Sequence, residues 1–348
     1  MNAAQRKTLA ALRKRLRTPS WPALHETLDE LAAAGDDEIL GVLGEGLSLS
    51  PLGRIIIRPK SEVHHRIRAP LRRDAALLIA RMCGLLDAAT VLLLEKRAHL
   101  SELSLLDGLP ALEKVSLLES ARPLDLTALA SLPQLRRLSL AQNQPQPSRH
   151  PFDLSILTQL PKLESLTLHC FRTLTDLSVL ADLPGLRTLK VWNADALTDL
   201  SGLKATPKLT ELELQGLPAL QDFSPLAGLG ALTRLSLYRC PLTDPTILGS
   251  LPVLEVLELG GCALHDLSPL AALPELTNVT LVACSALIDV SPLTTLPKLT
   301  SLQLIRCESI SDISSLTRAV SLETVNLTSS RQVTGDDVLR ASGIAIQR

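Results

Sequence analysis

Four cysteines recur at near-constant spacing and are the first residues of this sequence to suggest chemistry. Cys240, Cys262, Cys284 and Cys307 follow one another at intervals of 22 or 23 residues, and His265 makes Cys262 part of a C-x-x-H pair. Thiolate and imidazole groups bind Zn²⁺, but a zinc site needs four converging ligands. A buried cysteine that binds nothing behaves as a small hydrophobic residue. We therefore interpret the four cysteines as structural and expect no metal.

Motifs of catalysis and of cofactor binding do not occur in the chain. The sequence lacks G-x-x-x-x-G-K-[ST], G-x-G-x-x-G, G-x-S-x-G and H-E-x-x-H, which are the common phosphate, dinucleotide, nucleophile and zinc signatures. The seven histidines are scattered along the sequence, whereas catalysis needs converging groups. The sequence predicts a protein without enzymatic activity and without a cofactor.

A single pattern, L-x-x-L-x-L-x-x-C, repeats along most of the chain and explains the cysteine spacing. Its fourth and sixth positions are Leu or Val in all ten copies, and proline stands two residues before the first leucine in eight. Self-similarity at this period is the signature of a repeat architecture. A weaker eleventh copy begins near Val91. The first leucines of the ten copies are Leu112, Leu135, Leu163, Leu186, Leu209, Leu232, Leu254, Leu276, Leu299 and Leu322.

Each repeat predicts one strand followed by one tight turn. The L-x-L segment alternates as a strand does, so its leucines point to one side. The segment D-L-S-P-L-x-x-L-P that follows places apolar residues three apart, as in Leu267, Leu270 and Leu273, which fits a 3₁₀ helix. Asp266 and its counterparts Asp289 and Asp312 are expected to cap that turn. Since no unit closes its own apolar side, neighbouring units must stack.

This combined pattern resembles leucine-rich repeats, and D-L-S-P-L-x-x-L-P-x-L-T is most similar to the internalin-type repeats of bacteria. The resemblance covers residues 90–348. It implies an α/β solenoid, a horseshoe with a concave parallel sheet, which binds other proteins. Internalins are exported and anchored on the cell surface, whereas this chain shows neither an apolar signal segment nor an L-P-x-T-G motif. Adhesion is therefore not expected to carry over.

The resemblance also assigns a place to the ninth residue of each repeat. Family repeats carry Asn or Cys there, with the side chain turned inward to bond the backbone of the neighbouring turn. The chain has Asn143 in an early copy and the four cysteines in later ones. We expect these five residues to form a structural ladder.

The outward residues of the strands form the candidate binding surface. The chain has only two Trp and one Tyr, and Trp192 and Tyr238 both fall at the seventh position of a repeat, with His169 one repeat earlier. Trp, Tyr and Arg are enriched at binding hot spots. The expected partner-binding residues on the concave face are His169, Lys190, Trp192, Glu213, Arg234, Tyr238, Arg239, Val282, Ile305 and Arg306.

The first 88 residues do not repeat and are predicted to form a small helical capping domain before the solenoid of residues 89–348. Residues 20–34, 37–43 and 75–86 carry helix signals, and residues 333–348 predict a closing helix and a short strand. Residues 141–153 extend one repeat as a rim loop. A basic stretch has two interpretations, a solvated connection, which we favour, or an anion-binding site. Its residues are Arg54, Arg58, Lys60, Arg66, Arg68, Arg72 and Arg73.

Composition narrows the class of partner. The net charge is −1, so no global field favours nucleic acid or a membrane surface, and no apolar run is long enough to span a bilayer. Unpaired cysteines favour a reducing, cytoplasmic compartment. The main hypothesis is a cytoplasmic bacterial scaffold that binds another protein on its concave face. Two alternatives are a nucleic-acid-linked regulator that uses the basic segment and a secreted effector or immunity-type binding protein.

Overall fold

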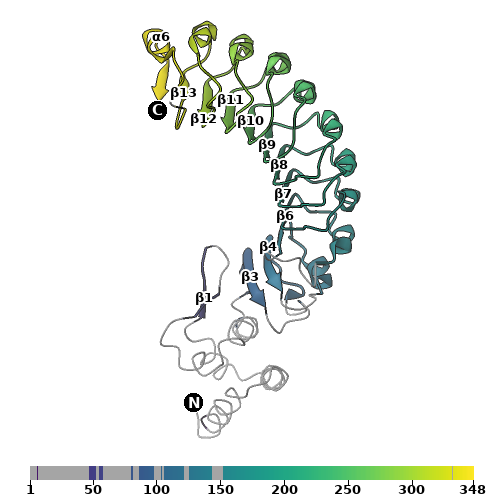
Figure 1. The fold of residues 1–348 in the computed structure, drawn as a ribbon. Helices are drawn as coiled ribbons and strands as arrows, with labels where there is room; N and C mark the ends of the chain where they lie inside the picture. Colours follow the sequence, from purple (N-terminus) through teal and green to yellow (C-terminus); the bar gives the residue numbers. More distant parts are fainter. Residues whose placement is uncertain are drawn as a thin grey trace. The chain divides into compact units, whose positions relative to one another are not determined.

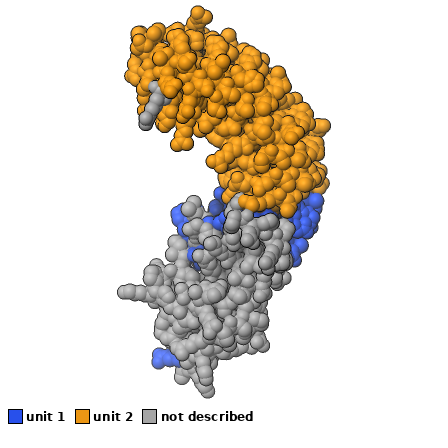
Figure 2. All heavy atoms as spheres, viewed as in Figure 1, with its two compact units in different colours: residues 1–160 blue, residues 161–348 orange. Residues whose placement is uncertain are grey.

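A computed structural model of the 348-residue chain divides into two compact units, residues 1–160 and residues 161–348 (Figure 2). The structure describes residues 47–51, 55–57, 86–97, 106–120, 125–142, 152–330 and 332–348, together with positions 6, 80 and 103. Among these residues, no helix combines the length and the apolar character needed to cross a bilayer. The helices predicted at 20–34, 37–43 and 75–86 lie almost wholly outside the described residues.

The first unit contains the start of the repeat. Strands β3 (Val91–Arg97), β4 (Lys114–Ser120) and β5 (Arg137–Ala141) pair in parallel and in register. The weak copy predicted at Val91 is therefore a strand. The 3₁₀ helices η2 (Thr127–Ser131) and η3 (Leu154–Gln159) follow in this unit. An antiparallel hairpin of β1 (Leu47–Leu49) and β2 (Ile55–Ile57) precedes the repeats, in a domain that the sequence predicted to be helical and at a place where it predicted no strand.

The second unit is a curved coil whose strands form one parallel sheet on the inner side of the arc (Figure 1). Consecutive strands pair with matching repeat positions opposite each other. Within residues 161–330 and 332–348 these strands are β6 (Ser165–His169), β7 (Thr188–Trp192), β8 (Glu211–Gln215), β9 (Arg234–Tyr238), β10 (Val256–Gly260), β11 (Asn278–Val282), β12 (Ser301–Ile305), β13 (Thr324–Asn326) and β14 (Ala345–Gln347).

Short 3₁₀ helices lie on the outer side of the same arc (Figure 1). Leu267, Leu270 and Leu273 are buried around one of them, which confirms the predicted three-residue period. In the described part of this unit they are η4 (Ser178–Leu180), η5 (Ser201–Ala205), η6 (Ser224–Gly228), η7 (Thr246–Ser250), η8 (Ser268–Ala272), η9 (Ser291–Thr295) and η10 (Ser314–Arg318).

The core between strands and 3₁₀ helices is built from leucine. The first, fourth and sixth repeat positions are buried throughout the unit, as at Leu276, Val279 and Leu281. Because a leucine of one coil packs on its equivalents in the coils before and after, one buried row continues through the unit. The C-terminal end closes with helix α6 (Asp336–Ala341) and β14, where the sequence predicted a helix and a short strand.

Candidate functional site

The candidate binding surface is the outward face of the sheet in the second unit. Strand register pairs His169 with Trp192, Trp192 with Gln215, and Gln215 with Tyr238. All four side chains are half-buried. The two rings therefore lie on the same face, two strands apart, as the repeat spacing predicted. They are neither enclosed in the core nor on opposite faces.

Trp192 contacts the histidine of the preceding strand. The ring centroids of His169 and Trp192 lie 5.6 Å apart with the planes at 80°, an edge-to-face arrangement. The Nδ2 of Asn193 lies 3.2 Å from His169 Nε2, within hydrogen-bond distance. Burial lowers the pKa of His169. The indole Nε1 of Trp192 is buried and has no acceptor among the described residues.

Tyr238 lies across the neighbouring strand, which carries glycine opposite it. A Cβ on Gly260 would lie 2.1 Å from Tyr238 Cδ1 and 2.4 Å from Cε1, so only glycine leaves room for this ring position. Gly260 is buried as a result, although its repeat position is an outward one. The aliphatic part of the Arg239 side chain lies beside Gly261 of the next strand's end. Its Cγ is 3.8 Å from the position that a Cβ on Gly261 would occupy. Burial, followed by the charges of Glu258 and Glu213, raises the pKa of Tyr238 to about 12.

A row of charged side chains lies next to the rings, at the fifth repeat position. Lys190 Nζ contacts Glu211 Oε1 at 2.8 Å and Glu213 Oε2 at 3.1 Å. Burial lowers the pKa of Lys190, but the hydrogen bonds with these two carboxylates outweigh it and raise the pKa. Further along the row, Ser236 Oγ donates to Glu258 Oε2 at 2.7 Å. The surface is therefore mixed in charge and its acidic groups lie near the rings.

The remaining predicted surface residues extend this face. Arg234, Arg239 and Arg306 are exposed. Val282 and Ile305 are half-buried and continue the column of Tyr238 and Gly260 through the register of β10, β11 and β12. The structure thus places eight of the ten predicted residues in strands of one sheet, and Arg239 and Arg306 directly after the ends of β9 and β12. Whether these residues bind a partner stays a prediction.

The cysteine ladder is confirmed in the described residues. The Sγ of Cys240 lies 3.5 Å from Leu214 O, a carbonyl of the preceding coil, and Cys262, Cys284 and Cys307 repeat this arrangement at 3.4–3.7 Å. Ser330 continues it, with Oγ donating to Leu304 O at 2.8 Å. The four thiols are buried and form no disulfide. Asn143, the fifth predicted member, lies outside the described residues.

The residue at the eighth repeat position has a left-handed backbone conformation, and this conformation turns the ninth side chain toward the core. Asn193, Arg239, Ala283 and Arg306 have φ values of 49–55°, a region that costs an L-residue energy. Their N–H groups donate to the next coil, as Ala283 N does to Ile305 O at 2.8 Å. The reversal of direction turns the ninth side chain away from the concave face and into the core.

Aspartates cap the 3₁₀ helices, as the sequence predicted. Asp312 Oδ1 accepts the N–H of Ser314 at 2.9 Å, and its Oδ2 accepts the Ser314 hydroxyl at 2.8 Å. Asp266 and Asp289 cap in the same way. Each of six such aspartates accepts hydrogen bonds from the residue two positions after it, and these bonds lower the pKa of the aspartate. The six are Asp125, Asp176, Asp222, Asp244, Asp266 and Asp312.

Two of the predicted features lie outside the described residues. They are most of the rim loop, at positions 143–151, and the basic residues Arg54, Arg58, Lys60, Arg66, Arg68, Arg72 and Arg73. An anion-binding role for that segment stays a prediction. In the described part of the chain, no three His, Cys, Asp or Glu side chains lie close enough to hold a metal ion. Cys262 is buried and His265 is exposed, so their sequence spacing does not bring them together.

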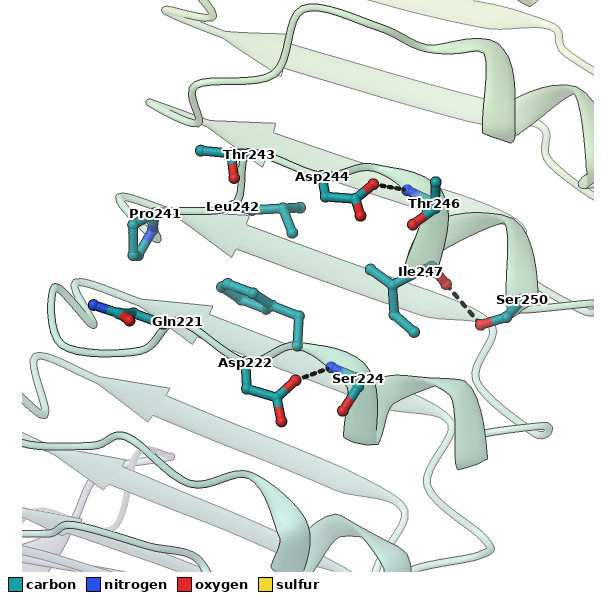
Figure 3. Close-up of a pocket in the computed structure, with 11 residues that line it drawn as sticks. Gln221, Asp222, Ser224, Pro241, Leu242, Thr243, Asp244, Thr246, Ile247 and Ser250 are labelled. Atoms are coloured by element: carbon teal, nitrogen blue, oxygen red, sulfur yellow. Dashed lines mark hydrogen bonds between the residues drawn. The ribbon is translucent and has the colours of Figure 1, made fainter.

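A cavity of about 400 Å³ lies between two coils of the second unit (Figure 3), and the sequence analysis did not predict it. Phe223, Leu242 and Ile247 are among its lining residues, and Asp222 and Asp244 lie at its edge, each accepting the N–H two residues on. Four residues lie between Leu217 and Asp222, but only three lie between Cys240 and Asp244. The coil of Cys240 also carries Pro245 at the position where the coils on either side carry Phe223 and Leu267.

Comparison with known proteins identifies the architecture. No protein-family profile matches the chain, and a search of curated proteins gave no match. Among solved structures, an internalin from Listeria monocytogenes is similar, with a TM-score of 0.55, 27% identity, and coverage of 76% of this chain and 75% of that one.

A leucine-rich-repeat protein of Leptospira interrogans has the same fold, with a TM-score of 0.50, 17% identity, and coverage of 77% of this chain and 80% of that one. These likenesses agree with the parallel strands and the 3₁₀ turns of the coils. The second unit therefore has the leucine-rich-repeat fold, and its parallel sheet with 3₁₀ turns fits repeats of the internalin type.

Proposed function

We propose that this chain is a non-enzymatic scaffold that holds a partner protein on the outward face of strands β6–β12, with Trp192 and Tyr238 as the anchors. The observation that carries the proposal is the placement of these two rings in one half-buried column. A chain with two Trp and one Tyr uses one of each on this face. Leucine-rich-repeat proteins are typically binding scaffolds, which supports this class of function.

The local chemistry of the face also supports the proposal. Large rings supply contact area at little entropic cost, and Trp, Tyr and Arg dominate binding energies at interfaces. The Trp192 indole N–H lacks an acceptor among the described residues, and a buried donor without a partner costs about 1–3 kcal/mol. Features that cost stability in this way are expected at functional positions.

We also propose that the protein works in a reducing compartment, the bacterial cytoplasm. The supporting observation is that four buried thiols each lie against a carbonyl of the preceding coil. Disulfide formation would remove that arrangement. Cell fractionation that places the protein outside the cytoplasm would refute this part of the proposal.

The test of the binding proposal is affinity capture from the lysate of the native cell with a double variant, Trp192→Ala with Tyr238→Ala. We expect the variant to keep the circular dichroism and unfolding midpoint of a folded solenoid and to lose the captured partner. The matched control is Ile288→Ala with Val320→Ala. Both residues are large, apolar and exposed, at 65% and 88%, and lie outside the strands. Equal capture by wild type and the double aromatic variant would refute the proposal.

A further inference from the structure

The charge on the proposed binding face is unbalanced at the centre of the sheet. Register places Glu213, Ser236 and Glu258 side by side on strands β8, β9 and β10. Lys190 is the neighbouring cation, and it is shared between Glu213 and Glu211. The row of Lys190, Glu213, Ser236 and Glu258 therefore has a net charge of −1, and its one ammonium group is shared with a further carboxylate outside the row.

A small residue lies between the two glutamates. Ser236 is 5% exposed and its hydroxyl is committed to Glu258. Because strands lie about 4.8 Å apart, the backbones that carry Glu213 and Glu258 are roughly 10 Å apart. Ser236 is therefore covered by its neighbours, and the carboxylates of Glu213 and Glu258, which are partly exposed, are the groups that a ligand from outside would meet.

The tyrosine ring borders this position. Tyr238 follows Ser236 by two residues, so both side chains leave β9 on the same face. Gly260 lets the ring lie over β10, the strand that carries Glu258. Both glutamates also act on the phenol, since their charges contribute to its raised pKa. A neutral ring and two carboxylates therefore meet at one place.

The positive side chains of β9 lie at its two ends. Arg234 is its first residue and Arg239 follows its last, with the stem of Arg239 beside Gly261. The centre is acidic and aromatic, whereas the ends are basic. A negatively charged side chain of the partner would be repelled by the carboxylates at the centre. An apolar side chain would remove water from these carboxylates without supplying a positive charge, which is unfavourable.

We propose that a basic side chain of the partner protein, Arg or Lys, binds above Ser236, between Glu213 and Glu258 and against the ring of Tyr238. This inference rests on the proposed function and specifies the partner's chemistry at its central contact. Guanidinium and ammonium groups bind both carboxylates and aromatic faces. Gly260 then acts as a positioning residue, because any side chain there would displace the ring.

The experiment uses the full chain and a displayed peptide library, with the double variant Trp192→Ala, Tyr238→Ala as the counter-selection. We expect the enriched peptides to share one Arg or Lys. Replacing that residue by Ala should weaken binding to the wild type about tenfold, as measured by fluorescence anisotropy. The same replacement should cost less than about threefold against Glu213→Gln with Glu258→Gln, because the interaction is already lost.

Three further variants separate positioning from folding. Tyr238→Phe keeps the ring and should retain most of the affinity, whereas Gly260→Ala should lose about as much as removing the basic residue. Glu308→Gln, an exposed acidic position outside the sheet, should behave as wild type. Unfolding midpoints within error of wild type exclude a folding defect.

The outcomes distinguish the inference from the proposed function. Enriched peptides without a shared basic residue, or an equal Arg→Ala loss on wild type and on the double Gln variant, overturn the inference while the binding face stands. A library that yields no peptide preferring wild type over the double aromatic variant counts against both.

Discussion

Two coils approach each other closely at Gly202, and this contact predicts a large loss of stability on Gly202→Ala. Gly202 lies in η5, where η6, η8 and η9 carry proline at the same position. A Cβ on Gly202 would lie 2.0 Å from the carbonyl oxygen and 2.4 Å from the carbonyl carbon of Leu177. Both are backbone atoms, so no rotamer change relieves the contact.

The size of the expected loss of stability follows from the atoms that must move to make room for the added Cβ. Leu177 is fully buried, and its carbonyl accepts the N–H of Leu180 at 3.0 Å. Overpacking of this kind costs about 1–3 kcal/mol, and weakening that hydrogen bond costs about 1 kcal/mol more. Alanine returns about 0.4–1 kcal/mol by restricting the unfolded chain. We expect a net destabilisation of about 2 kcal/mol.

The matched control is Gly228→Ala. Gly228 is the last residue of η6 and has nothing within 4 Å of a built Cβ, so the entropy term alone should stabilise by about 0.5 kcal/mol. Urea unfolding followed by circular dichroism gives both midpoints at a common slope. A midpoint for Gly202→Ala equal to or above that of Gly228→Ala would refute the reasoning.

Three other predictions concern backbone strain and titration. Ala283→Gly should stabilise the folded protein by about 0.5–1 kcal/mol. Ala283 has a left-handed φ of 51°, and the strain that glycine relieves there exceeds the extra backbone entropy that glycine loses on folding. A lower thermal midpoint for the variant would contradict this. Tyr238, the sole tyrosine, should ionise near pH 12 when its ultraviolet absorbance is followed, and Glu258→Gln should lower this pKa. Because the pKa of Tyr238 is higher in the folded than in the unfolded protein, its contribution to stability is fully present below pH 10. That contribution is lost as the pH rises through the folded pKa. The capping aspartates have lowered pKa values, so their contribution is present above the unfolded pKa of about 3.9 and is lost as pH falls through the folded values. Thermal melts should drop in acid, and Asp266→Ala with Asp312→Ala should flatten that drop; an unchanged acid slope would count against the caps.

The sequence predicted the structural features that are determined by a residue's position within the repeat. Because each coil stacks in register on the one before, equal positions in the pattern become neighbours in space. The column of Trp192 and Tyr238 and the row of cysteines follow from spacing alone. The inward turn of those cysteines came from the resemblance, and the structure adds its cause, a left-handed residue before each one.

Features that depend on differences between neighbouring coils were not predicted. The contact of Tyr238 with Gly260 and the double ion pair of Lys190 depend on rotamers and on which residues happen to be adjacent. The cavity beside Phe223 lies between two coils whose loops differ in length and sequence. The hairpin of β1 and β2 has strands of three residues, too short for an alternating pattern to be recognised.

The row of cysteines has a use beyond packing, as a set of built-in reporters. Burial raises the pKa of Cys240, to about 12, and of Cys262, so these thiols are protonated and shielded from alkylating reagents while their coils are closed. Cys284 and Cys307 continue the series one coil at a time. The alkylation rate of each, resolved by mass spectrometry, would measure how often its own coil opens, and so whether the solenoid frays from its end or opens in the middle.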